Sequence, residues 1–164
     1  MPLNDQEVSS IEFENDGVTD SLTGVMAPSL FHENLKREIA RAGRQEHDLA
    51  VISISVKPSN FQSVSLLQEE LIKIADTLRE QLRGGDFFTR ISDLGFWALL
   101  RADESETDAA IGRLGLPNQK KLDIYVLARK KDGYDEWIIL PCLAQMKCKN
   151  FLKIIWKQLK IRKK

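Results

Sequence analysis

The chain has 164 residues, which is enough for one domain with a substantial hydrophobic core. Its 24 Lys and Arg residues balance 24 Asp and Glu residues, so no overall positive field favours a nucleic-acid partner. Cys142 and Cys148 are too few for a disulfide scaffold and belong to no zinc-binding pattern. No stretch has the length of a membrane span, and no signal peptide is recognisable. We therefore expect a soluble cytoplasmic domain.

The two ends of the chain carry opposite charge. Residues 1–20 contain acidic residues and no Lys or Arg, whereas residues 143–164 contain basic residues and no acid. The acids are Asp5, Glu7, Glu12, Glu14, Asp16 and Asp20, and the bases are Lys147, Lys149, Lys153, Lys157, Lys160, Arg162, Lys163 and Lys164. We divide the chain into an acidic tether or short helix over 1–18, a folded domain over 19–142 and a basic amphipathic helix over 143–164.

Hydrophobic periodicity predicts two helices with a strand between them. Each helix carries apolar residues at helical spacing along one side. These positions are Phe31, Leu35, Ile39 and Ala42 in the first helix, and Phe61, Val64, Leu67, Leu71, Ile74, Leu78 and Leu82 in the second. Residues 49–56 predict the strand, because apolar residues alternate there with Ser53 and Ser55.

A β-hairpin is predicted directly after the second helix. Residues 87–91 and 96–100 are rich in strand formers, and the turn formers Ser92, Asp93 and Gly95 separate them. The elements expected after the hairpin are a short helix at 104–114, a strand at 122–128, a turn at 132–133 and a strand at 136–140.

Two short motifs flank these elements. Asp20-Ser21-Leu22-Thr23-Gly24 precedes the first helix, and Arg83 and Asp86 join the second helix to the hairpin. In this order and spacing they resemble the D-x-L-T-G and R-x-x-D motifs of the GGDEF domain, the diguanylate cyclase family. The resemblance covers residues 20–113 well and the remainder poorly. It implies an α/β (α+β) fold, with a mostly antiparallel central sheet of about five strands and helices on both faces.

The catalytic turn of that family is replaced in this chain. Arg90 and Phe96 match residues that the family places around its Gly-Gly-Asp/Glu-Glu-Phe signature, which here reads Ser92-Asp93-Leu94-Gly95-Phe96. The resemblance places a metal-binding carboxylate at Leu94 and a catalytic Glu at Gly95. Neither side chain performs that chemistry.

The first strand lacks a second carboxylate that the resemblance implies at its end. Ser55 and Lys57 occupy the candidate positions, and a lysine there would repel Mg²⁺. The nucleotide contacts that the family has near the start of the next helix are also missing from Gln62-Ser63-Val64-Ser65. We therefore expect no cyclase activity, no bound metal and no cofactor.

Arg83 and Asp86 match the inhibitory site of active relatives, which the resemblance implies grips a dimer of cyclic di-GMP. A guanidinium fork suits a guanine edge or phosphate, and a carboxylate accepts from guanine N–H groups. The resemblance also implies a further Arg from the following helix, for which Arg113 is the nearest candidate. A structural interpretation stays open: Arg83 closes the helix, Gly84-Gly85 caps it, and Asp86 is the ion-pair partner of Arg83.

Residues 151–160 have the pattern of a basic amphipathic helix. Such a helix packs on the domain's own sheet, binds an anionic membrane surface with Trp156 at the interface, or contacts an acidic partner protein. No nucleic-acid recognition motif accompanies the basic residues. The acidic N-terminal segment, in the same molecule or in a second copy within a homodimer, is a further partner for it.

Two functions remain open. In the first, the chain is a catalytically inactive GGDEF-like domain of bacterial signalling that acts as a cyclic di-GMP receptor or regulatory module through Arg83 and Asp86. In the second, it is a noncatalytic protein–protein interaction or scaffold domain that binds no nucleotide. The intact R-x-x-D motif favours the first function. The altered second half and the biased terminal charge favour the second.

Overall fold

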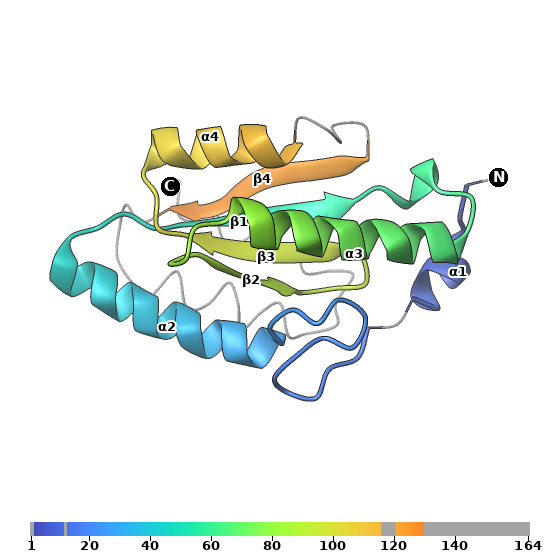
Figure 1. The fold of residues 1–164 in the computed structure, drawn as a ribbon, viewed down its shortest axis with the longest axis horizontal. Helices are drawn as coiled ribbons and strands as arrows, with labels where there is room; N and C mark the ends of the chain where they lie inside the picture. The colour runs from blue at the N-terminus through green and yellow to red at the C-terminus, as the bar shows by residue number, and fades with distance from the viewer. Residues whose placement is uncertain (1, 12, 116–120, 130–164) are drawn as a thin grey trace, which may run out of the picture.

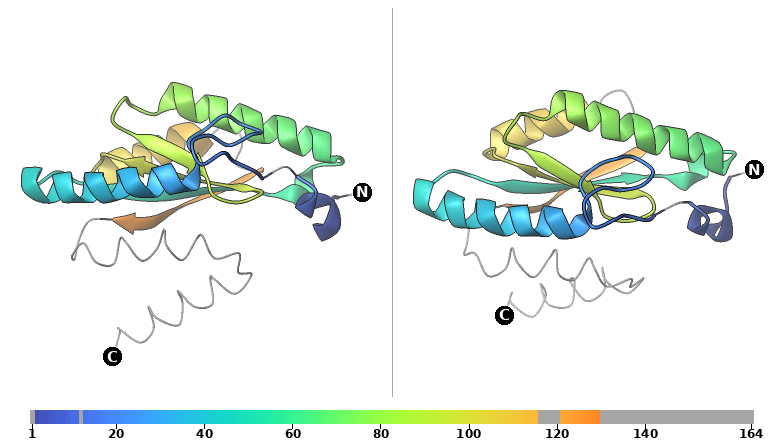
Figure 2. Two further views of the ribbon diagram at one scale, coloured as in Figure 1. Left: turned by 90° about the horizontal axis from the view of Figure 1, so that it is seen from below. Right: turned by 60° about the horizontal axis from the view of Figure 1, so that its bottom comes forward.

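A four-stranded antiparallel sheet lies at the centre of the fold (Figure 1). The structure is a computed structural model that describes residues 2–11, 13–115 and 121–129. The strands lie in the order β2-β3-β1-β4, and helices cover both faces of the sheet (Figure 2). The strand bounds are Ala50–Val56 (β1), Phe87–Arg90 (β2), Gly95–Leu100 (β3) and Leu122–Arg129 (β4). The predicted α/β fold with a mostly antiparallel sheet is confirmed.

β1 is an inner strand of this sheet, and both of its faces are buried. Ile52 and Ile54 pack in the cluster on one face, and Val51 packs in the cluster on the other. Ile52 lies opposite Ala98 of β3, and Ile54 lies opposite Ile124 of β4. Six of the seven β1 residues are buried, as expected for a strand with neighbours on both edges and helices on both faces.

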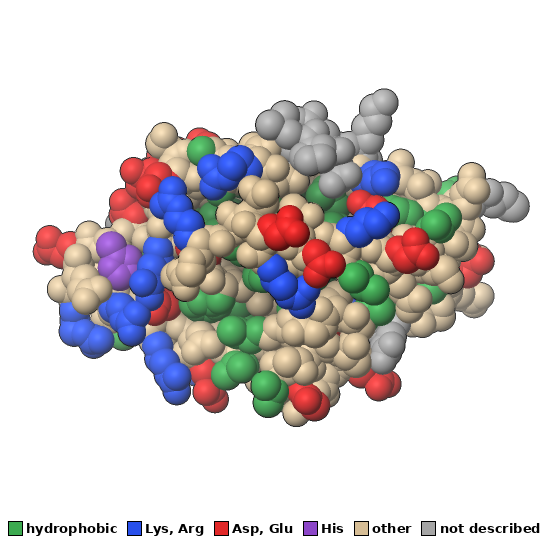
Figure 3. All heavy atoms as spheres, in the orientation of Figure 1, with side chains coloured by type: hydrophobic (Ala, Val, Ile, Leu, Met, Phe, Trp, Pro, Cys, Tyr) green, Lys and Arg blue, Asp and Glu red, His purple; other side chains and the backbone are tan. Residues whose placement is uncertain are grey.

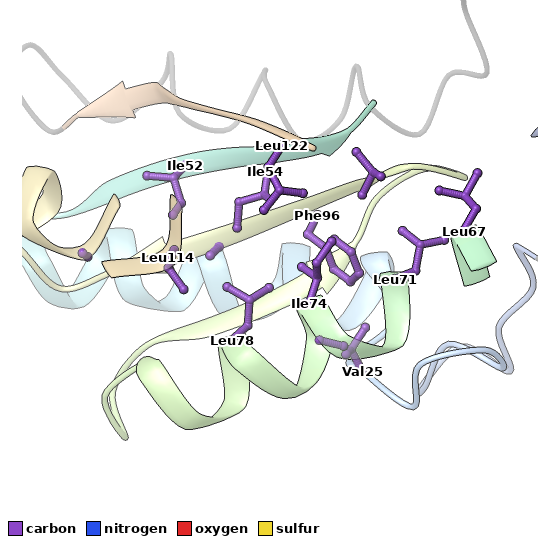
Figure 4. Packing of buried hydrophobic residues seen from close by; sticks show 14 of the residues in the cluster. Val25, Ile52, Ile54, Leu67, Leu71, Ile74, Leu78, Phe96, Leu114 and Leu122 are labelled. Carbon is purple, nitrogen blue, oxygen red and sulfur yellow. The ribbon is translucent and has the colours of Figure 1, made fainter. Parts of the chain in front are cut away.

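α3 (Val64–Gln81) and α4 (Glu104–Gly115) cover one face of the sheet. Ser63 caps α3 by accepting a hydrogen bond from the backbone N–H of Leu66 at 3.3 Å. The predicted apolar stripe of α3 faces the sheet (Figure 4), which confirms the helix and its orientation. Its most buried members are Leu67, Leu71, Ile74 and Leu78.

α2 (Pro28–Gln45) packs on the opposite face. Pro28 begins the helix, where its missing N–H costs no hydrogen bond. The predicted apolar positions are all buried, and they form a second cluster with residues of β1 and β3. This cluster contains Phe31, Leu35, Ile39, Ala42, Leu49, Val51, Trp97 and Leu99.

The N-terminal segment contains a short helix, α1 (Asp5–Ser9), rather than only a tether. Asn4 and Glu7 form a capping box at its start, and Ile11 is buried in the cluster beneath α3. A 3₁₀ turn, η1 (Pro58–Asn60), links β1 to α3. No helix in the described residues is long and apolar enough to cross a membrane. The strand predicted at 136–140 and the helix predicted within 143–164 lie outside the described residues.

Candidate functional site

The R-x-x-D residues form a closed turn between α3 and β2. The backbone N–H of Asp86 donates to the carbonyl of Arg83 at 2.9 Å, and the backbone N–H of Arg83 donates to Asp86 Oδ2 at 3.0 Å. Asp86 Oδ1 accepts from the backbone N–H of Arg101, just after β3, at 2.9 Å. The Asp86 carboxylate therefore ties the end of α3 to the end of β3.

The guanidinium of Arg83 pairs with Glu106, not with Asp86 as the structural interpretation predicts. Nη1 of Arg83 lies 3.2 Å from Oε1 of Glu106, in the first turn of α4. The two side chains are 62% and 44% exposed, and ion pairs at such exposure contribute about 0–1 kcal/mol. A competing anion therefore reaches this guanidinium at little cost.

Arg113 is exposed in the last turn of α4. It lies seven positions after Glu106, which places it about 10 Å further along the helix on the same side. Within the described part of the chain, no hydrogen bond or ion pair joins Arg113 to Arg83 or Asp86. The structure brings Arg83 and Asp86 together and leaves Arg113 apart from them.

The sequence analysis missed a second arginine at this turn, Arg101. Its Nε and Nη2 donate to Glu38 Oε2 at 2.8 and 2.7 Å, and this hydrogen bonding raises the pKa of Arg101 above its usual value. The Glu38 side chain is only 9% exposed, and its other oxygen pairs with Arg41 at 3.1 Å. A glutamate between the core positions Leu35 and Ile39 is the sequence signal of a buried counter-ion.

The positions that the resemblance assigns to metal binding and to the catalytic Glu meet at the other end of β3. Ser55, near the end of β1, lies opposite Gly95 at the start of β3, directly after Leu94. Lys57 extends its ammonium to Asp123 of β4 at 2.9 Å. Among the described residues, no group of three or more His, Cys, Asp or Glu side chains is arranged to hold a metal ion.

The altered signature has a local structure of its own. Ser92 is exposed, Asp93 and Leu94 are partly buried, and Gly95 and Phe96 are buried. A Cβ at position 95 would lie 2.8 Å from Ser92 Oγ. Glycine fits at position 95 without any change in the turn, whereas any larger residue there would require the Ser92 side chain to move.

A buried ion pair joins the hairpin to the D-x-L-T-G motif. Arg90 Nη1 lies 3.2 Å from Asp20 Oδ1, and the two side chains are 0% and 1% exposed. Asp20 Oδ2 also accepts from the Thr23 backbone N–H at 2.8 Å and from its hydroxyl at 2.6 Å. Nη2 of Arg90 donates to the Asp93 carbonyl at 3.0 Å. These contacts fix the hairpin turn to the loop that precedes α2.

Comparison with known proteins identifies the fold. No protein-family model matches the sequence, and no curated protein does. The GGDEF domain of DgcB from Caulobacter crescentus, in complex with cyclic di-GMP, superposes with a TM-score of 0.65 at 13% identity, over 74% of this chain and 82% of that one. The GGDEF domain of TpbB (YfiN) from Pseudomonas aeruginosa gives 0.61 at 21% identity, over 84% and 99%.

A third similar structure is the diguanylate cyclase SiaD in complex with its activator SiaC from Pseudomonas aeruginosa. It superposes with a TM-score of 0.60 at 16% identity, over 76% of this chain and 58% of that one. Similarity at this level of identity concerns the fold, which is GGDEF-like.

Proposed function

We propose that this chain is a noncatalytic regulatory domain that binds cyclic di-GMP at the turn Arg83–Asp86. The observation that carries the proposal is the form of this turn. Two hydrogen bonds between Arg83 and Asp86 close its backbone, a third joins Asp86 to the Arg101 N–H, and the Arg83 side chain stays 62% exposed. A turn that is already ordered loses less conformational entropy when a ligand binds. The similar DgcB domain, whose structure contains cyclic di-GMP, supports the choice of ligand.

The charged groups of the turn retain binding capacity. A carboxylate offers about four acceptor sites, and the two backbone N–H groups occupy one site on each oxygen of Asp86. If Arg83 gives up its exposed ion pair with Glu106 to contact a phosphate, the lost ion pair costs about 0–1 kcal/mol. Arg83 and the spare acceptor sites of Asp86 can therefore contact an anionic ligand with a guanine edge.

The end of β1 supports the absence of cyclase activity. Ser55 and Leu94 offer no carboxylate to Mg²⁺, and Asp123 is already paired with the ammonium of Lys57. Without a metal ion, the charge that develops during phosphoryl transfer lacks its main stabiliser. We expect no cyclic di-GMP to form from GTP and Mg²⁺. A rate of cyclic di-GMP formation that rises in proportion to the protein concentration would refute this part of the proposal.

Isothermal titration of cyclic di-GMP into the purified chain tests the binding part. We expect micromolar or tighter binding that disappears in Arg83→Ala. Lys73→Gln is the matched control, because it removes one exposed positive charge from α3, about 12 Å before the end of the helix that leads to Arg83. The control should bind as the wild type does. No heat and no thermal shift at high ligand concentration, or unchanged binding by Arg83→Ala, would refute the proposal.

Protein–protein interaction without nucleotide is the second candidate function. Its supporting observation is that Asp86 and Arg83 already have partners within the chain. The similar SiaD structure contains a protein partner, its activator SiaC. If the titration shows no binding, capture by the full chain should identify a partner. Loss of that partner on replacing Lys153, Lys157 and Lys160 with Gln would assign its recognition to the basic segment.

A further inference from the structure

The R-x-x-D turn contacts a second guanidinium, that of Arg101. A Cβ built on Gly85 would lie 3.2 Å from both Cδ and Nη1 of Arg101, and 3.4 Å from its Cζ. The guanidinium therefore lies against the tip of the turn. The backbone N–H of the same residue holds Asp86. Arg101 thus touches the turn through its backbone and through its side chain.

Glu38 holds this guanidinium in place. Nε and Nη2 of Arg101 are used on Glu38 Oε2, which leaves Nη1 on the side of Gly85. The Glu38 carboxylate is buried and is shared with Arg41, so the two arginines outnumber the acid between them. Lys and Arg side chains gather at this end of the molecule, around the C-terminal end of α2 at the left of Figure 3. Three arginines, Arg41, Arg83 and Arg101, therefore lie at or near the turn, and their paired acids are Glu38 and Glu106.

We propose that Arg101 is a second ligand-contacting guanidinium of this site, which donates from Nη1 to a phosphate oxygen of the dinucleotide while Glu38 positions it. This inference rests on the proposed function. Arg83 and Arg101 lie at one turn, and a cyclic dinucleotide offers phosphate oxygens at more than one point. A guanidinium that is fixed in advance, as Arg101 is by Glu38, recognises phosphate better than a flexible lysine does, because less side-chain entropy is lost. Arg101 then takes the place of the helix arginine for which Arg113 was the candidate.

Two adjacent glycines provide a matched test. A methyl group at Gly85 meets Arg101 at 3.2 Å, whereas one at Gly84 meets nothing within 4 Å. Neither glycine has a positive φ, so alanine adds little backbone strain at either position. Gly84→Ala adds the same methyl group to the same turn without meeting Arg101, so it measures the effect of the methyl group on the turn alone. Gly85→Ala requires the Arg101 guanidinium to shift by a few tenths of an ångström and should weaken binding roughly 3–10-fold.

Arg101→Gln removes the guanidinium and keeps the backbone N–H that binds Asp86. We expect cyclic di-GMP to bind about tenfold more weakly or worse, and Lys73→Gln to bind normally. The affinity of Arg101→Gln should also fall less steeply with added salt than that of the wild type, because one ionic contact is gone. A purely structural role would leave this salt dependence unchanged. If Arg101→Gln fails to fold, the double variant Glu38→Gln/Arg101→Gln is titrated in its place. The double variant leaves no unpaired carboxylate of Glu38 buried beside position 101.

The outcomes separate this inference from the proposed function. If the wild type binds, Arg83→Ala does not, and both Arg101→Gln and Gly85→Ala keep the wild-type affinity and salt dependence, the role of Arg101 is refuted and the proposed function stands. Equal weakening by Gly84→Ala and Gly85→Ala also refutes it, because the methyl group then acts on the turn alone. If the wild type does not bind cyclic di-GMP, the proposed function and the role of Arg101 are both refuted.

Discussion

The buried ion pair between Arg90 and Asp20 predicts that Arg90→Met strongly destabilises the domain. Both side chains are at most 1% exposed, and the pair joins the hairpin to a loop 70 positions earlier. Removing the guanidinium leaves the Asp20 carboxylate buried without its counter-ion, although Thr23 still donates to it from its backbone N–H and its hydroxyl. The Asp93 carbonyl loses its donor as well.

Breaking a buried ion pair by removing one partner costs about 3–5 kcal/mol. Methionine keeps much of the arginine's length, so a cavity adds little to this cost. In a domain of this size each kcal/mol lowers Tm by about 2–4 °C, so we expect a decrease of roughly 6–20 °C. Asp20→Asn/Arg90→Met should cost less than the two single variants together, because no unpaired charge stays buried.

Urea unfolding followed by far-UV circular dichroism measures these free energies. Lys57→Met is the control, because it breaks an ion pair whose side chains are 37% and 58% exposed, and it should cost less than about 1 kcal/mol. If Arg90→Met is unfolded in buffer, Arg90→Lys keeps the charge and brings the loss into the measurable range. A cost for Arg90→Met no larger than that of the control, or strict additivity in the double variant, would refute the reasoning.

Three smaller perturbations test other parts of the fold. Thr89→Val removes a hydroxyl that donates to the Met26 carbonyl at 2.7 Å, and urea unfolding should show a loss of about 1–2 kcal/mol. Gly17→Ala, at φ +85°, should cost about 1 kcal/mol and Gly84→Ala little; equal costs would contradict the φ argument. Hydrogen bonds from the backbone N–H groups of Thr19 and Val18 lower the pKa of Asp16 below its ordinary 3.8 in the folded chain. The ionised Asp16 therefore stabilises the fold fully above pH 3.8, and this contribution is lost as the pH falls through the lowered pKa of the folded state. Asp16→Asn should flatten the acid side of the Tm–pH profile.

Periodicity predicted the helices and strands well. The stripe from Leu67 to Leu78 identifies the face of α3 that the structure buries, whereas the alternation in β1 identifies the strand but not its burial, because Ser53 is buried as well. The hairpin was also predicted correctly, because turn formers lie between two runs of strand formers. These are short-range signals, and neighbouring residues alone generate them.

The polar contacts of the site were harder to predict. The ion pair of Arg83 with Asp86, which belonged to the structural interpretation, was wrong, because the Asp86 carboxylate accepts from the backbone N–H groups of Arg83 and Arg101 instead. Arg83 then pairs with Glu106, which chain folding brings within reach of it. A carboxylate beside fixed backbone donors satisfies them without ordering a long side chain, which costs entropy.

Local sequence signals were sufficient to predict the order of helices and strands, the apolar stripes of the helices and the lack of carboxylates at Ser55 and Leu94. Which charged groups meet depends on how the chain folds in three dimensions. Arg101 and Glu38 are 63 positions apart, and they pair because β3 ends beside the buried side of α2. Local propensity depends on near neighbours, whereas an ion pair at this separation depends on sheet register and helix packing together. The proposed ligand site is therefore a product of the fold as much as of its motif.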